Sequence, residues 1–130
     1  MKKKTVRVLR IAPMEVPEIV NVVNNLDSWQ KAVSEGSEDQ GLIEVINLSD
    51  TACLICHEEG KLIGLQPNRR LCEDIICGTF YVVGQDKHGN FTSLSKTDLE
   101  FYSLVFEIPR SSLPMKWRIR SLRSSMCFEV

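Results

Sequence analysis

The sequence predicts a single α+β domain with one small mixed β-sheet and two helices, in the order β-β-α-β-β-β-α. Short alternating or β-branched apolar segments, typical of strands, recur between residues 5 and 83. Two further segments, residues 25–33 and 95–106, carry apolar residues at the i, i+3 and i+7 spacing of amphipathic helices. A chain of 130 residues with 43% hydrophobic residues is large enough to bury a core without metals or disulfides.

The first two strands are expected at residues 5–11 and 17–23. The first alternates, with Val6 and Val8 on one face and Leu9 and Ile11 on the other. Pro13 follows this strand, and the second segment is rich in valine and isoleucine. The short connection between the two segments predicts a hairpin.

Each expected helix begins at a residue that can cap it, Asn25 in the first and Ser95 in the second. We expect both helices to cover one face of the sheet. Their apolar stripes are Leu26, Trp29 and Val33 in the first helix, and Leu99, Tyr102 and Phe106 in the second.

The remaining strands are expected at residues 42–48, 51–56 and 75–83, and the last of these is apolar enough to be central. No linker or repeat interrupts residues 1–109, which we interpret as the single domain. Residues 110–130 form a basic C-terminal extension, either a tail or an extra strand.

Charge is distributed unevenly although the formal net charge is only -1. Residues 1–10 and 110–130 hold ten Lys or Arg and one acid, whereas residues 11–109 hold six basic and sixteen acidic residues. Arg7 and Arg10 interrupt what would be the apolar region of a signal peptide, and no stretch is apolar for long enough to span a membrane. We expect a cytoplasmic protein without a membrane partner.

The cysteines Cys53, Cys56, Cys72, Cys77 and Cys127 are odd in number and are expected to be free, mostly buried thiols. The run CLICH matches a haem attachment motif, and the first four cysteines have nearly the spacing of a zinc site. Haem attachment takes place outside the cytosol, and a strand would turn Cys53 and Cys56 to opposite faces. Cys53, Cys56 and Cys77 also lie in apolar strands that supply a core without zinc, so we predict neither cofactor nor metal.

The sequence contains no catalytic constellation. His57 and His88 stand beside turn residues, where exposed histidine is the common outcome, and no phosphate-binding glycine motif or nucleophile elbow is present. We therefore do not predict an enzyme.

The segment of residues 66–74 is the favoured binding loop, because polar residues between apolar segments often carry function. Arg69 offers a planar fork that suits a phosphate or carboxylate, so a nucleotide-like small anion is the expected ligand. In the alternative interpretation Arg69 pairs with Glu73 or Asp74 and Asn68 caps the turn. The candidate ligand-binding residues are Asn68, Arg69, Arg70, Asp74 and Thr79.

The basic extension gives a second hypothesis, association with nucleic acid, because its cations alternate with apolar residues and an aromatic residue can stack on a base. In the alternative interpretation the extension is an edge strand or a tail that sits on the acidic body. The candidate nucleic-acid-binding residues are Lys116, Trp117, Arg118, Arg120 and Arg123.

The segments EEGKLIGLQPNR, at residues 58–69, and DIICGTFYVVG, at residues 74–84, resemble the domain-of-unknown-function family 3846. The resemblance covers roughly residues 5–108, and the loop at 34–41, the cysteines and residues 110–130 depart from it. It implies a small protein of a phage, plasmid or Gram-positive bacterium, with no established activity. We therefore expect a non-enzymatic binding or accessory protein of a mobile element, in a counter-defence role, that binds a small anion or a host protein; a homo-oligomer is left open.

Overall fold

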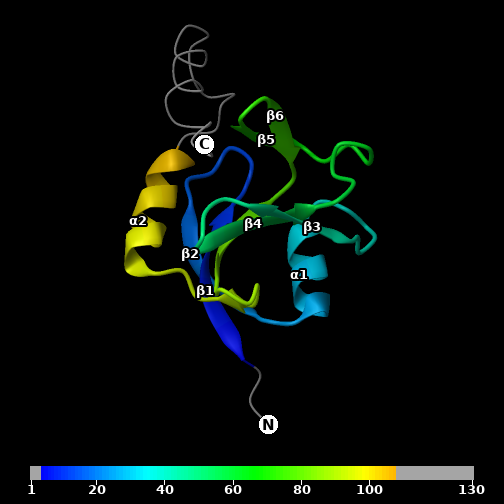
Figure 1. Cartoon of the computed structure of the whole chain (residues 1–130). Coiled ribbons are helices and arrows are strands. Elements are labelled where there is room, and N and C mark those ends of the chain that lie inside the picture. The colour runs from blue at the N-terminus through cyan, green and yellow to red at the C-terminus, as the bar shows by residue number, and fades with distance from the viewer. Residues whose placement is uncertain (1–3, 108–130) are drawn as a thin grey trace, which may run out of the picture.

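The computed structural model of the chain describes residues 4–107, which contain two helices and eight strands (Figure 1). In chain order these elements are β1 (Thr5–Ile11), β2 (Glu18–Val23), α1 (Leu26–Val33), β3 (Ile43–Asn47), β4 (Ala52–His57), β5 (Pro67–Leu71), β6 (Asp74–Cys77), β7 (Phe80–Gln85), β8 (Phe91–Thr92) and α2 (Lys96–Val105).

The main sheet is antiparallel, with the order β2-β1-β7-β4-β3, and the short β8 pairs with the end of β7. The predicted hairpin of β1 and β2 is confirmed, since Val8 pairs with Val20. The prediction of a central strand is confirmed for β7, which lies between β1 and β4 and is buried over most of its length. The predicted α+β class, with two helices, is therefore confirmed.

Two cores lie on opposite faces of the main sheet, because neighbouring residues of a strand point to opposite sides. Val6 and Val8 of β1 belong to the core that contains Trp29 of α1. Leu9 and Ile11 of the same strand belong to the core that contains residues of α2. Figure 1 shows the two helices on either side of the sheet, so the prediction that both cover one face is wrong. An amphipathic stripe shows which side of a helix is buried, but it does not show which face of the sheet receives it.

The predicted caps of both helices are confirmed. The main-chain N–H of Ser28 donates to Asn25 Oδ1 at 2.8 Å, and that of Asp98 donates to Ser95 Oγ at 3.1 Å. Such a cap typically stabilises a helix by about 1 kcal/mol.

The segment of residues 66–77 differs from the prediction of a polar loop followed by the start of a long strand. β5 and β6 pair as an antiparallel hairpin, which forms a separate two-stranded sheet. The predicted strand of residues 75–83 breaks at Gly78, whose φ of +87° is a conformation that glycine adopts readily. Only β7 therefore joins the main sheet, and Cys77 is half-buried rather than a core residue.

Candidate functional site

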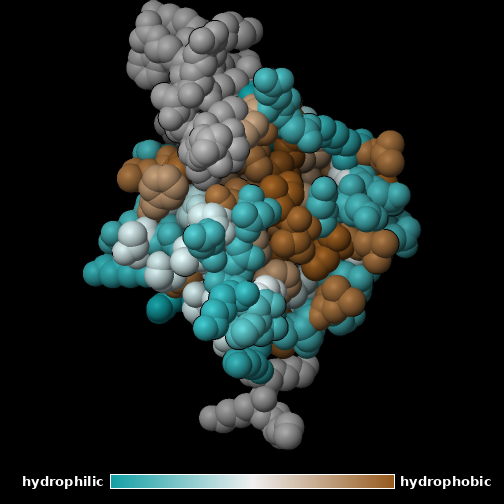
Figure 2. Space-filling model, viewed as in Figure 1, coloured by the Kyte–Doolittle hydropathy of each residue, from teal (hydrophilic) through white to brown (hydrophobic). Residues whose placement is uncertain are grey.

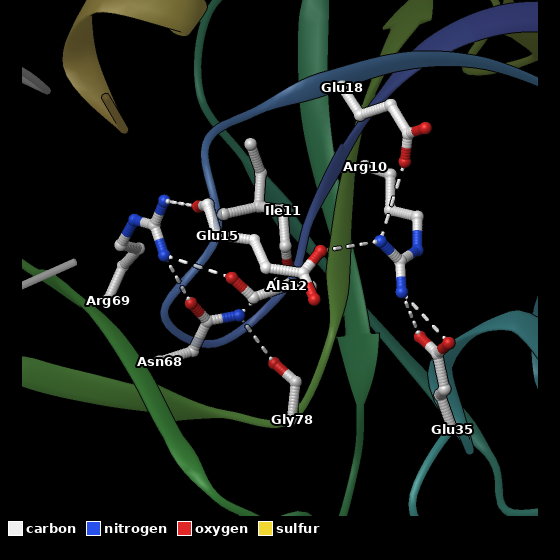
Figure 3. A network of polar contacts seen from close by, with 9 residues as sticks. All are labelled: Arg10, Ile11, Ala12, Glu15, Glu18, Glu35, Asn68, Arg69 and Gly78. Carbon is white, nitrogen blue, oxygen red and sulfur yellow. Dashed lines mark hydrogen bonds and ion pairs between the residues drawn. The ribbon is translucent and has the colours of Figure 1, made fainter. Parts of the chain in front are cut away.

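The side chain of Arg69, on β5, is completely buried, and all five of its N–H groups donate hydrogen bonds. Nε and Nη2 donate to the main-chain carbonyl of Phe106 at 3.0 and 2.8 Å. Figure 3 shows the other bonds, in which Nη1 donates to the carbonyl of Ala12 at 3.1 Å and Nη2 donates to that of Glu15 at 2.6 Å. Nη1 also donates to Asn68 Oδ1 at 2.8 Å. Every one of these acceptors is a neutral carbonyl oxygen.

Asn68 extends this network, because its side-chain amide donates to the main-chain carbonyls of Ile11 and Gly78, both at 2.8 Å (Figure 3). Burial lowers the pKa of Arg69 to about 10, which leaves the guanidinium charged at neutral pH. The network ties the β5–β6 hairpin to the end of β1 and to the end of α2. The interpretation that Arg69 pairs with Glu73 or Asp74 is wrong, since its acceptors are these carbonyls.

The five candidate ligand-binding residues do not line one cavity. Asn68 and Arg69 use their polar groups inside the protein, and Arg70 is half-buried, with an Nε that has no hydrogen-bond partner among residues 4–107. Asp74 and Thr79 line two different pockets. The five candidate nucleic-acid-binding residues, Lys116, Trp117, Arg118, Arg120 and Arg123, lie outside the described residues.

Asp74 lines a pocket of about 310 Å³ between β3, β4, the turn at residues 58–62 and β6, which we call the acidic pocket. Figure 2 shows apolar surface gathered over the region of β3, β4 and the β5–β6 hairpin, with hydrophilic residues around it. The carboxylates that line the acidic pocket are Glu44, Glu58, Glu59 and Asp74, and its lysine is Lys61. Glu58 and Glu59 are exposed, and neither forms an ion pair with another described residue. The pocket is therefore electronegative.

Lys61 and Asp74 form an ion pair across the acidic pocket, from the turn to β6. The hydrogen bonds that Asp74 accepts from Lys61 and from the N–H of Ile75 lower the pKa of this carboxyl. Gly60 permits the close approach, because a Cβ atom at this position would lie 2.7 Å from the carbonyl oxygen of Cys77. The turn and β6 therefore form two adjoining walls of the pocket.

Apolar groups line the rest of the acidic pocket, including Ile46 on β3 and Ile76 on β6. Two thiols also line it, those of Cys56 and Cys77. Burial, together with the negative charge of Glu44, raises the pKa of Cys56 to about 12, and burial raises the pKa of Cys77. Both thiols are thus held in the protonated form, which is a poor nucleophile.

His57 lies at the end of β4 beside the acidic pocket and is buried, so the expectation that it is an exposed turn residue is wrong. Its Nδ1 accepts a hydrogen bond from the N–H of Glu59 at 2.9 Å. Its ring fills the space beside Gly41, where a Cβ atom would lie 2.1 Å from Nε2. The histidine therefore orients the turn at residues 58–62. His88 is exposed, as expected.

Thr79 lines the second pocket, of about 380 Å³, together with Arg10. Arg10 Nη1 lies 3.3 Å from a carboxylate oxygen of Glu15 and 3.5 Å from one of Glu18, and Nη2 lies 2.8 Å from one of Glu35 (Figure 3). Burial opposes the charge of Arg10, yet its hydrogen bonds and the charge of Glu35 raise its pKa above the ordinary value. Three carboxylates thus surround this cation, which leaves little positive potential for an anionic ligand.

Cys53 and Cys56 lie on opposite faces of β4, in different cores, as the prediction of a strand required. Burial raises the pKa of Cys53 to about 11. Within residues 4–107 no three His, Cys, Asp or Glu side chains gather closely enough to hold a metal ion. The two helices in this part of the chain are also too short to cross a membrane.

Comparisons with known proteins give a family but no activity. No curated protein and no solved structure matches the chain. The family model of a domain of unknown function, DUF3846, matches residues 6–107, which include every described helix and strand except the first residue of β1. The chain therefore belongs to the DUF3846 family.

Proposed function

We propose that this chain is a non-enzymatic binding protein whose partner is a polypeptide, and that the acidic pocket is its contact surface. The observation that carries the proposal is an open pocket in which exposed carboxylates stand beside apolar side chains. Mixed apolar and charged surfaces of this kind are common where proteins bind one another.

The charges around the acidic pocket favour a basic partner. Lys61 already pairs with Asp74, so Glu58 and Glu59 remain to attract cations from solution. Leu62, in the same turn, exposes 83% of its surface and adds an apolar contact at the rim. A segment that alternates cationic and apolar side chains would meet both kinds of group.

A small anionic ligand at residues 66–74 is less well supported. The N–H groups of Arg69 are all used by carbonyl oxygens, and Arg10 is surrounded by three carboxylates. A phosphate bound by Arg69 would have to displace buried hydrogen bonds, which are costly to leave unmade. The protein partner is for this reason preferred to the nucleotide.

The biological setting is also part of the proposal. The resemblance implies a protein of a phage or mobile element, and from that setting we propose that the chain acts in the host cytosol on a host protein, in a counter-defence role. Binding of nucleic acid through the basic extension is the alternative, and it predicts an affinity that falls steeply with salt.

Fluorescence anisotropy with labelled peptides of equal length would test the contact surface. One peptide alternates Lys or Arg with apolar residues, one alternates Glu with the same apolar residues, and a single-stranded oligonucleotide serves as the third probe. Each probe is titrated with the wild-type chain and with a four-serine variant, in which Lys116, Arg118, Arg120 and Arg123 are changed to Ser. This variant removes four of the five cations of the basic extension.

The double substitution Glu58→Lys/Glu59→Lys should weaken binding of the basic peptide to the four-serine variant by about tenfold or more. Glu38→Lys/Asp39→Lys is the matched control, because these acids are also adjacent and exposed but do not line the acidic pocket. Equal loss in both double variants, or failure of the basic peptide to bind, would overturn the proposal. Binding of the oligonucleotide alone, lost in the four-serine variant, would favour the alternative.

A further inference from the structure

The lining of the acidic pocket suits an occupant that is both cationic and apolar, and the same chain carries such a segment. From residue 110 to residue 128 the sequence has five Lys or Arg and no acid. Within it, residues 115–120 read MKWRIR. Alternation of this kind places the cations on one side of an extended chain and the apolar residues on the other.

The described part of the chain ends beside the wall of the acidic pocket. Phe106, the residue after α2, is fixed by its two hydrogen bonds from Arg69 on β5. β5 pairs along its length with β6, and β6 lines the acidic pocket. The segment after residue 107 therefore begins next to the β5–β6 hairpin, and the acidic pocket lies on the other side of this hairpin.

The connection is long enough to reach the acidic pocket. The five residues of β5 span roughly 17 Å at the usual rise of a strand. Residues 108–115, when extended, span up to about 26 Å. The segment at residues 115–123 can therefore pass the hairpin and meet the carboxylates on its other side.

We propose that residues 115–123 of this chain bind in its own acidic pocket. Their cations face Glu58 and Glu59, while Met115, Trp117 and Ile119 face the apolar side. The inference rests on the proposed function, because it uses the same pocket, and it makes the basic extension a competitor of the partner.

The covalent connection is the reason to prefer the chain's own segment over a foreign one of the same chemistry. A tethered segment binds at a high effective concentration, on the order of millimolar for a short connection, whereas a separate partner must supply its full affinity. The rest of the chain also has the complementary charge, since residues 11–109 carry sixteen acids and six bases.

Trp117 reports on the contact in the full-length chain. Trp29, the other tryptophan, is 1% exposed and is shielded from a soluble quencher in the core. Acrylamide quenching of the wild type, compared with Trp117→Phe, therefore isolates the accessibility of Trp117. We expect it to be quenched severalfold less than the same residue in a synthetic peptide of residues 110–130.

The substitutions Glu58→Lys/Glu59→Lys should restore quenching of Trp117 to the level of the free peptide, as should high salt. Glu38→Lys/Asp39→Lys, with the same change in net charge, should leave it shielded. Overturning results are quenching in the wild type equal to that of the free peptide, or equal release by both double variants.

The peptide titration separates this inference from the proposed function. If both hold, the basic peptide binds the four-serine variant at least severalfold more tightly than the wild type, because the pocket is no longer occupied. Equal affinity for the two chains overturns the inference and leaves the proposed function standing. If the peptide binds neither chain, the proposed function fails. The intramolecular contact is still supported in that case if Trp117 is shielded in the wild type and becomes accessible in Glu58→Lys/Glu59→Lys.

Discussion

The main-chain carbonyl of Phe106, at the end of α2, accepts two hydrogen bonds from the guanidinium of Arg69, at 3.0 and 2.8 Å. The last carbonyls of a helix have no partner within the helix and carry partial negative charge. α2 has no basic residue in its own last turn, so β5 supplies the cation from elsewhere in the chain. The same side chain holds the carbonyls of Ala12 and Glu15, between β1 and β2. Arg69 thus joins three separate segments.

Arg69→Ala should lower the free energy of unfolding by about 3 kcal/mol or more. Hydrogen bonds from a charged donor contribute about 1.5–3 kcal/mol each, and the carbonyls would remain buried without partners. Urea denaturation measures the change. Arg7→Ala removes the same charge from an exposed position on β1 and should shift the free energy of unfolding by less than about 0.5 kcal/mol. A similar small effect for both variants would contradict the structural role of Arg69.

The sequence predicted the elements of this fold better than the role of Arg69. The caps at Asn25 and Ser95 and the two faces of β1 follow from local patterns, which the structure confirms. Apart from the side-chain oxygen of the neighbouring Asn68, the acceptors of Arg69 are main-chain carbonyls 37 to 57 positions away in the chain, and these leave no signature in side-chain type. A polar residue between apolar segments can therefore be a buried anchor as readily as a binding residue.

The acidic pocket shows the same limit. Glu58 and Glu59 follow a buried strand, and Glu44 lies on a strand of otherwise mostly apolar residues, so the acids themselves were visible in the sequence. Their convergence with Asp74 depends on the turn at Gly78, which separates β6 from β7. The sequence pattern alone predicts one strand over residues 75–83, and such a strand would not place β6 opposite β3.

Gly78→Ala should destabilise the protein more than Gly89→Ala does. Both glycines have positive φ, +87° and +82°, so alanine is strained by about 1–2 kcal/mol at either position. At Gly78 the new Cβ would also lie 2.7 Å from Leu65 Cδ1, whereas nothing lies within 4 Å of it at Gly89. Thermal denaturation of the two variants isolates the packing cost, about 1–3 kcal/mol. Equal melting temperatures would show that Leu65 moves aside freely.

Lys61→Ala should raise the pKa of Asp74 toward the ordinary value of an aspartate, because the hydrogen bond from Lys61 is the largest cause of its lowered pKa. A carboxyl with a lowered pKa stabilises the folded state above the ordinary aspartate pKa, and this contribution is lost as pH falls through the lowered value. The variant should therefore lose some of its pH dependence in the acid range. A carboxyl NMR titration measures the shift.

Asp86 is the internal control for this titration, since its pKa is lowered by hydrogen bonds from Asn90 and His88, which the substitution does not touch. An unchanged Asp74 pKa in Lys61→Ala would show that the ion pair across the acidic pocket does not persist in solution.

Alkylation of the native protein should distinguish the thiols of the acidic pocket. Cys56 is buried, and its pKa is raised to about 12, whereas Cys77 is half-buried. Since the thiolate is the reactive form, iodoacetamide should modify Cys77 roughly tenfold faster than Cys56. Peptide mapping by mass spectrometry gives the rate at each site. The reverse order would mean that the pocket opens toward β4 rather than toward β6.

The same reaction reports whether the acidic pocket is filled. A saturating amount of the basic peptide should slow alkylation of Cys77 in the four-serine variant, because Cys77 lines the pocket. Cys72 lies at the turn between β5 and β6, is also half-buried and does not line the pocket, so its rate should stay constant. Protection of both cysteines would indicate a contact over the whole hairpin, and protection of neither would place the peptide elsewhere. Selective protection of Cys77 requires a ligand inside the pocket, since the two thiols share one hairpin and only Cys77 of the two lines the pocket.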